Sequence, residues 1–319
     1  MELMLARNNK VPDASQPIFI AGLARSGSTI LLNALYQTGC FRSLTYRDMP
    51  FVLMPGIWKK LSSGSRVSRA AKERAHKDRL LVEYDSPEAL EEVFWSTFSG
   101  DAYIFEDKLM PYKPSRSVCV RFREYVSHIM ASRDNERQNR YLAKNNNNLL
   151  RLGAIKFAFP DAKIIVPFRE PTQQALSLLR QHQLFTRMHT EDRFSMQYMN
   201  WLGHYEFGLG HKSYAYCATA NPFNKSSVNY WLQSWQDAYT FALNNAPPDT
   251  IFVSYESLCA DPVSGFRALF PALDLDADPA VAAKFYSGAD RRPVGADEAC
   301  LLDACTATHS RLLELHAAL

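Results

Sequence analysis

The sequence contains no long uninterrupted hydrophobic run and no strong excess of either charge. Its 319 residues include 36 Lys and Arg against 33 Asp and Glu, which leaves a formal net charge of only +3. No stretch reaches the roughly 18 apolar residues that a membrane-spanning helix needs, and segment 1–16 lacks the apolar core of a secretory signal. These absences argue against a membrane span and against a dedicated nucleic-acid binder, and we expect a cytoplasmic protein.

Cysteine is scarce and scattered, at positions 40, 119, 217, 259, 300 and 305, and no C-x-x-C pair occurs. In a chain of this size without a secretory signal, such cysteines indicate reduced thiols and not a disulfide framework. Cys300 and Cys305 have no matching His or Cys pair, so we do not expect a zinc site.

Short apolar runs followed by helical patterns recur along the chain. We expect strands at 17–21, 141–143, 162–168 and 250–254, and helices at 28–38, 87–98, 117–137, 147–158, 171–187, 227–245, 262–270 and 278–286. This alternation predicts a three-layer, P-loop-like α/β fold with a mostly parallel central sheet flanked by helices. The length fits one domain, 1–319, with insertions at about 50–140 and 188–225, the latter helical and aromatic-rich.

A glycine-containing loop, GLARSGST at 22–29, connects the first expected strand to the first expected helix. The spacing of Gly22 and Gly27 matches a Walker A loop, but Ser28 stands where the lysine should follow. The backbone N–H groups and the positive end of the helix dipole predict a phosphate cradle. Arg25, inside the loop, supplies the cation through a planar guanidinium.

The chemistry next to this loop gives little support to triphosphate hydrolysis. A kinase or NTPase needs Mg²⁺, held in part by a carboxylate at the end of a second apolar strand. Here strand 162–168 ends in Arg169, and strand 250–254 runs into Tyr255 and Glu256. A metal-free transfer fits better, because a sulfuryl group carries less charge than a phosphoryl group. A P-loop kinase or NTPase and a catalytically inactive nucleotide-binding protein of the same fold stay as alternatives.

Three segments resemble the sulfotransferases that use 3′-phosphoadenosine 5′-phosphosulfate (PAPS), in particular the protein-tyrosine and carbohydrate enzymes with an arginine in the loop. They are PIFIAGLARSGSTILLNAL, FPDAKIIVPFREPTQQALSLLRQH and FVSYESLCADP. In the family, an arginine and a serine spaced like Arg169 and Ser177 hold the 3′-phosphate. The resemblance implies transfer of a sulfuryl group from PAPS to a hydroxyl or amine by in-line displacement, with no metal.

The resemblance also implies catalytic roles. Arg25 would stabilise the leaving phosphate, and Lys144, at a strand end, the sulfuryl group. In the family a carboxylate about 20 residues after the loop arginine acts as general base; that position is Tyr46 here, so Asp48 is our first candidate and Glu83 the second. The expected cofactor-binding residues are Arg25, Ser26, Gly27, Ser28, Thr29, Arg169, Ser177, Arg291 and Arg292.

The acceptor is less defined, and a glycan, a lipid-linked precursor or a small molecule all fit. Segment 59–79 carries eight Lys and Arg against one Glu and one Asp. Such a run is either a solvated face or a contact for an anionic acceptor or a membrane surface. The aromatic residues of 188–225 come without a strong basic patch, which argues against nucleic-acid binding.

Overall fold

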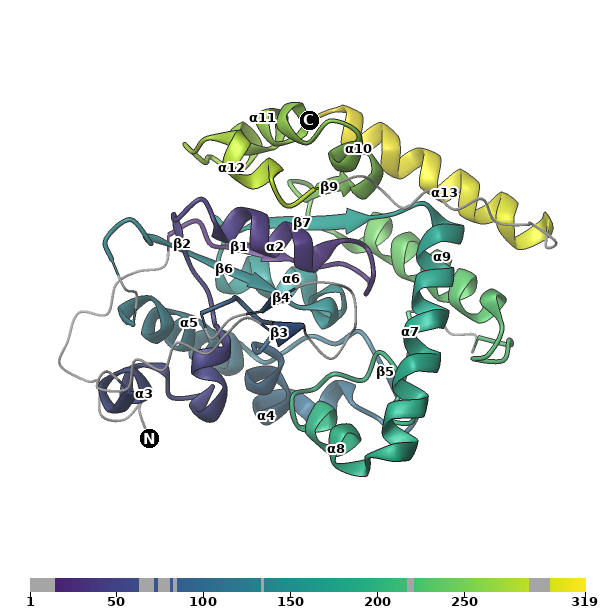
Figure 1. Ribbon diagram of the computed structural model, residues 1–319, viewed down its shortest axis with the longest axis horizontal. Helices are drawn as coiled ribbons and strands as arrows, with labels where there is room; N and C mark the ends of the chain where they lie inside the picture. The colour runs from purple at the N-terminus through teal and green to yellow at the C-terminus, as the bar shows by residue number, and fades with distance from the viewer. Residues whose placement is uncertain are drawn as a thin grey trace.

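The computed structural model describes residues 15–62, 72–73, 81–82, 85–132, 135–216, 221–286 and 299–319. Its centre is a five-stranded parallel sheet with the strand order β2-β6-β1-β7-β9 (Figure 1). The strands are β1 (Ile18–Ile20), β2 (Phe41–Arg42), β6 (Arg140–Lys144), β7 (Lys163–Phe168) and β9 (Ile251–Ser254). Helices flank this sheet, which confirms the predicted α/β fold.

The described helices are α2 (Ser28–Tyr36), α3 (Pro55–Ser62), α4 (Glu92–Tyr103), α5 (Arg116–Ala131), α6 (Leu152–Ala158), α7 (Pro171–Glu191), α8 (Arg193–Trp201), α9 (Val228–Asn245), α10 (Tyr255–Ala260), α11 (Pro262–Ala272), α12 (Pro279–Ala283) and α13 (Ala299–Ala317). Two 3₁₀ helices, η1 (Tyr46–Phe51) and η2 (Asn146–Arg151), follow β2 and β6. Two small sheets pair β3 (Lys72–Glu73) with β4 (Leu81–Val82), and β5 (Lys108–Leu109) with β8 (Ser213–Tyr214). Within the described ranges, no helix combines the length and the hydropathy needed to cross a membrane.

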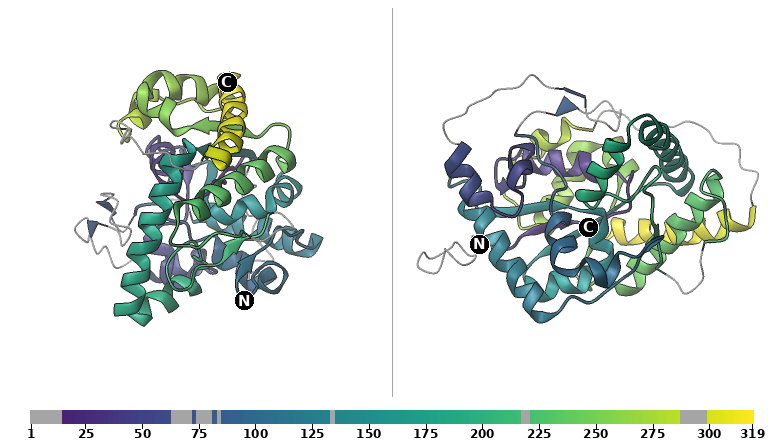
Figure 2. Two further views of the ribbon diagram at one scale, coloured as in Figure 1. Left: turned by 90° about the vertical axis from the view of Figure 1, so that its right-hand side faces the viewer. Right: turned by 90° about the horizontal axis from the view of Figure 1, so that it is seen from below.

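Alternate residues of β1 point to opposite faces of the sheet, as the two-residue period of a strand requires. Ile18 and Ile20 pack in a cluster with side chains of α2, α11 and α12, whereas Phe19 packs in a second cluster with side chains of α4, α5, α6, α7 and α9. All three β1 residues are fully buried. Figure 2 shows the sheet enclosed between these groups of helices. Burial on both faces explains why the sheet strands are almost continuously apolar.

The expected strands agree with β1, β6, β7 and β9 to within two residues at each end, but other boundaries differ. The two-residue strand β2 was not expected, because it is too short to show a pattern. The helix expected at 87–98 begins only at Glu92, because Pro87 forms a β-bridge with Thr45 and the Glu88 N–H bonds the Leu44 carbonyl at 2.9 Å. The helix expected at 147–158 is divided into η2 and α6.

Candidate functional site

The carboxyl ends of the central strands bring three predicted site segments to one edge of the sheet. Ile20, at the end of β1, lies in register with Lys144 of β6 and with Ile165 of β7. The loop 22–29 therefore leaves the sheet between the strand end that carries Lys144 and the strand that leads to Arg169. This edge is where parallel α/β sheets bind ligands.

Two glycines shape the loop. Gly27 precedes α2 with φ +87°, and a Cβ there would collide with the ring of Tyr255. At Gly22 a Cβ would lie 2.9 Å from Cγ of Pro167. The loop thus passes directly against β7 and α10, and only glycine fits at these points. Ser28 and Thr29 open α2, where the first backbone N–H groups have no helical partner.

The loop is tied to α7, far away in the sequence. The Arg25 Nε donates to the Ser177 hydroxyl at 3.0 Å across 152 positions. The Gln174 side-chain amide donates to the Ala24 carbonyl at 2.9 Å. The two predicted phosphate motifs therefore meet in one place, and α7 holds the main chain of the loop.

Arg169 lies beside this junction with hydrogen-bonding capacity to spare. Its Nε is buried without a hydrogen bond, 3.7 Å from the Glu256 carboxylate, and its guanidinium lies 5.0 Å from the centre of the Tyr255 ring. Burial raises the pKa of Glu256, although Arg169 and backbone hydrogen bonds lower it. Buried guanidinium N–H groups normally have partners, so the arrangement fits an anion bound at Arg169.

A charged cluster that the sequence did not reveal lies beside Lys144. The Glu206 carboxylate is buried, accepts from the Asn146 side-chain amide at 2.7 Å, and lies 3.7 Å from Nδ1 of His204. Burial disfavours both charges, but the attraction between the two groups outweighs it: the pKa of Glu206 falls to about 2 and that of His204 rises. Lys144 acts on both pKa values, so its charge is close to the pair.

Asp48, which we predicted as the general base, lies in a buried network of hydrogen bonds. It is buried, and both its oxygens accept from Nη2 of Arg42, at 3.0 and 2.9 Å. The Thr45 N–H also donates to it at 2.9 Å, which completes the capping box of η1. Both oxygens of Asp48 are therefore engaged in hydrogen bonds, which favours a structural role, and its role as general base stays a prediction. Tyr46, at the position of the family's carboxylate, donates to Glu88.

Some predicted positions are not described. Glu83, Arg291, Arg292 and most of the basic stretch 59–79 lie outside the described residues. Of the remaining loop candidates, Ser26 and Ser28 are buried. Among the described residues, no group of three or more His, Cys, Asp or Glu is arranged to hold a metal ion.

Comparison with known proteins gives a consistent result. The model of a sulfotransferase family matches residues 17–279. The crystal structure of sulfotransferase STF9 from Mycobacterium avium shares the fold, with a TM-score of 0.54 and 15% identity over 96% of this chain and 76% of that one. A sulfotransferase domain of the Synechococcus PCC 7002 olefin synthase aligns with a TM-score of 0.41 and 16% identity over 97% and 98% of the two chains. No curated protein matches. Because the family match spans most of the chain, including the loop, Arg169 and Ser177, the chain belongs to the sulfotransferase family.

Proposed function

We propose that this sulfotransferase uses PAPS as donor and a hydroxyl or amine as acceptor. The observation that carries the proposal is the hydrogen bond between Arg25 and Ser177, which joins the two motifs for the ends of the donor. Arg25 and the N–H groups of loop 22–29 would hold its 5′ end, and Arg169 and Ser177 its 3′-phosphate. When bound, PAPS supplies the sulfuryl group. Arginines and backbone dipoles can neutralise this group without a metal.

We further propose that His204 accepts the proton of the acceptor in its neutral form, at a pH above its raised pKa. The Glu206 carboxylate, which accepts from Asn146, lies 3.7 Å from Nδ1, and we assign Nε2 to the acceptor. The His204 side chain keeps 17% of its surface exposed, unlike the enclosed Asp48. Lys144, next to this pair, would stabilise negative charge on the transferring group. Histidine held by a carboxylate is a common general base.

A glycan, a lipid-linked precursor or a small molecule fits this site as acceptor, and the choice among them stays a prediction. A membrane contact through 59–79 also stays a prediction, because most of that segment lies outside the described residues.

The donor is tested by thermal shift. Adenosine 3′,5′-bisphosphate should raise the melting temperature in the absence of Mg²⁺, because ligand that binds only the folded state stabilises it by mass action. ATP should have a weak effect with or without Mg²⁺. Stabilisation by ATP and Mg²⁺ alone would instead identify a nucleotide kinase or NTPase.

The general base is tested by separating binding from transfer. His204→Gln and Glu206→Gln should keep the affinity for adenosine 3′,5′-bisphosphate and lose transfer of ³⁵S from labelled PAPS to acceptors in a cell extract, by about 10²-fold or more for His204→Gln. Asp48→Asn serves as the comparison. The result that would contradict the proposal is full sulfuryl transfer by His204→Gln together with loss of transfer by Asp48→Asn at unchanged donor affinity. Asp48 would then be the general base.

A further inference from the structure

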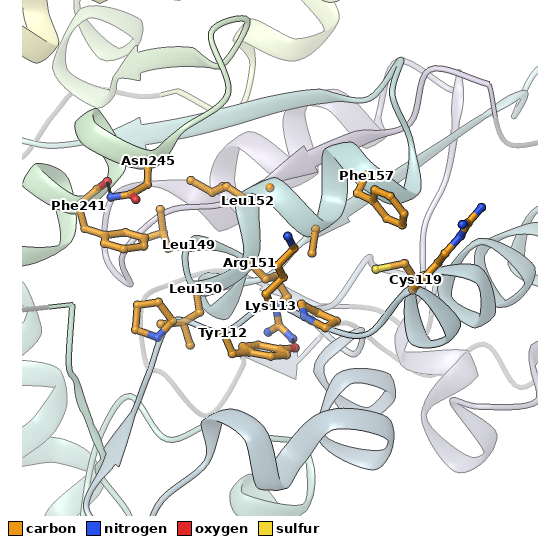
Figure 3. Close-up of a pocket in the computed structure, with 15 residues that line it drawn as sticks. Tyr112, Lys113, Cys119, Leu149, Leu150, Arg151, Leu152, Phe157, Phe241 and Asn245 are labelled. Carbon is orange, nitrogen blue, oxygen red and sulfur yellow. Dashed lines mark hydrogen bonds between the residues drawn. The ribbon is translucent and has the colours of Figure 1, made fainter.

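A cavity of about 730 Å³ lies away from the proposed donor site, between the start of α5, the η2–α6 segment and the end of α9 (Figure 3). Its lining includes Leu149, Leu152, Phe157 and Phe241. No residue of the loop 22–29, nor Arg169, Ser177 or Lys144, is among its lining residues. The volume lies within the range of about 300–1,000 Å³ that is usual for small-molecule sites.

The charges of this cavity are of one sign. Among its lining residues are Lys113, Arg116 and Arg151, and neither Asp nor Glu. Arg151 is fully buried and its charge is neutralised by Glu92. Lys113 and Arg116 are exposed, and in the described part of the chain neither forms an ion pair. They therefore leave a positive rim on a largely apolar cavity.

The floor of the cavity is a network of paired side chains around Arg151. The Arg151 guanidinium lies 4.8 Å from the Trp95 ring centre and 5.6 Å from that of Tyr112. It also donates to the Tyr112 hydroxyl at 2.9 Å. Glu92, its partner, accepts from Asn145 at 2.6 Å. The charged and polar groups of the floor are therefore already paired with one another, and a ligand does not need to supply their partners.

We infer that this cavity is a second ligand site, for one amphiphilic organic anion. The apolar body of the ligand lies against Leu149, Phe157 and Phe241, and its carboxylate, sulfate or sulfonate group faces Lys113 and Arg116. An uncharged apolar ligand would leave the two cations unused, and a small inorganic anion would leave the apolar wall in contact with water. The ligand has two possible sources, a fatty-acid-like carboxylate or a sulfate ester of an apolar alcohol.

The first test uses the fluorescence of 8-anilinonaphthalene-1-sulfonate, an aromatic sulfonate that becomes bright in apolar sites. Saturating adenosine 3′,5′-bisphosphate is present, so that the probe cannot report on the proposed donor site. The double variant Lys113→Gln/Arg116→Gln should bind the probe at least tenfold more weakly. Arg123→Gln, an exposed arginine on α5 that does not line the cavity, is the matched control and should bind normally.

A second variant fills the cavity without disturbing the fold. Gly153 lines the cavity, and a Cβ there would have no atom within 4 Å. Gly153→Leu should therefore keep its melting temperature and its affinity for adenosine 3′,5′-bisphosphate while it loses probe binding. Unchanged probe affinity in this variant and in the double variant would overturn the inference.

Competition identifies the source of the ligand. Decanoate and decyl sulfate, below their micelle concentrations, should displace the probe, and the stronger competitor indicates which of the two sources applies. Decanol should compete much more weakly, because it lacks the charge. Failure of both anions, or equal competition by decanol, contradicts the inference. The separate affinity for adenosine 3′,5′-bisphosphate shows whether the proposed sulfotransferase function has failed independently.

Discussion

At the scale of single residues, the two arginines of the proposed donor site, Arg25 and Arg169, lie in different environments. The Arg25 Nε already donates to Ser177, whereas the Arg169 Nε is buried without a hydrogen bond. Arg25 is therefore part of the link between the loop and α7. The main chain of Arg169 is held in place by the Trp235 indole, which donates to the Arg169 carbonyl at 3.1 Å.

Arg169→Ala should weaken the binding of adenosine 3′,5′-bisphosphate far more than that of adenosine 5′-monophosphate. Only the bisphosphate carries the 3′-phosphate that we place at Arg169. A hydrogen bond to a charged group contributes about 1.5–3 kcal/mol, so a loss of roughly 10- to 100-fold is expected. Isothermal titration calorimetry measures both affinities. Equal losses for the two ligands would show that Arg169 does not bind the 3′-phosphate.

Asp48→Ala should cost stability and not donor binding. It leaves the Arg42 guanidinium buried without its counter-ion, which typically costs about 3–5 kcal/mol. Urea unfolding measures this loss. Asp85→Ala is the matched control, since the exposed ion pair of Asp85 with Arg47 should contribute no more than about 1 kcal/mol. Similar stabilities of the two variants would contradict the structural role of Asp48.

At the scale of elements, the site depends on the contact between the loop 22–29 and its neighbours α7 and α10. The helix α7 carries both Gln174 and Ser177 to the loop, and α10 places Tyr255 over Gly27. None of these contacts is local in sequence. The loop is therefore shaped by the way in which the helices pack on the sheet.

Gly27→Ala should disturb this junction. The new methyl group would meet Tyr255 in a backbone conformation with φ +87°, so we expect a loss of at least about 1 kcal/mol together with weaker binding of adenosine 3′,5′-bisphosphate. Gly153→Ala is the control: its Cβ meets no atom within 4 Å, and it should be neutral or stabilise by up to about 1 kcal/mol. Urea unfolding and calorimetry test both variants, and equal behaviour would argue against a special conformation at Gly27.

At the scale of the whole molecule, folding places several histidines where a charge is disfavoured. Burial, reinforced by the nearby Lys225, lowers the pKa of His182 to about 4 and that of His211 to about 3. Both are held by the packing of the 188–225 segment: His182 accepts from the Gly208 N–H at 3.2 Å, and His211 contacts the Tyr230 hydroxyl at 2.8 Å. His204 is the opposite case, since its pKa is raised.

These shifts predict that the protein loses stability as the pH falls below about 6.5, the pKa of an unfolded-chain histidine. There the unfolded chain takes up protons before the native His182 and His211 do, so the free energy of unfolding decreases, by at most about 1.4 kcal/mol per pH unit for each histidine. The interaction of His204 with Glu206 does not oppose this loss. Because the pKa of His204 is raised in the native state, the stabilisation from this interaction is fully present below pH 6.5. It decreases only as the pH rises through the native pKa of His204. Glu206 adds a further loss between pH 4.5 and about 2.

Urea unfolding at pH 7, 6 and 5 measures this slope. His211→Gln should reduce it, because the variant removes one of the two buried neutral histidines. A stability that is independent of pH in this window would contradict the burial of neutral histidines.

The sequence by itself determined the α/β class, four of the five central strands, the loop 22–29 and the family resemblance, because each rests on local patterns: apolar strands, glycine spacing, and an arginine that ends a strand. It also predicted that Arg25, Arg169 and Ser177 belong to one donor-binding site. Only the tertiary structure showed the contacts of Asp48 and the proximity of His204 to Glu206. Asp48 forms an ion pair with Arg42, six positions away, whereas Glu206 accepts a hydrogen bond from Asn146, 60 positions away. Burial and neighbouring charges set the environments of these side chains, and both depend on packing that a local sequence pattern does not contain.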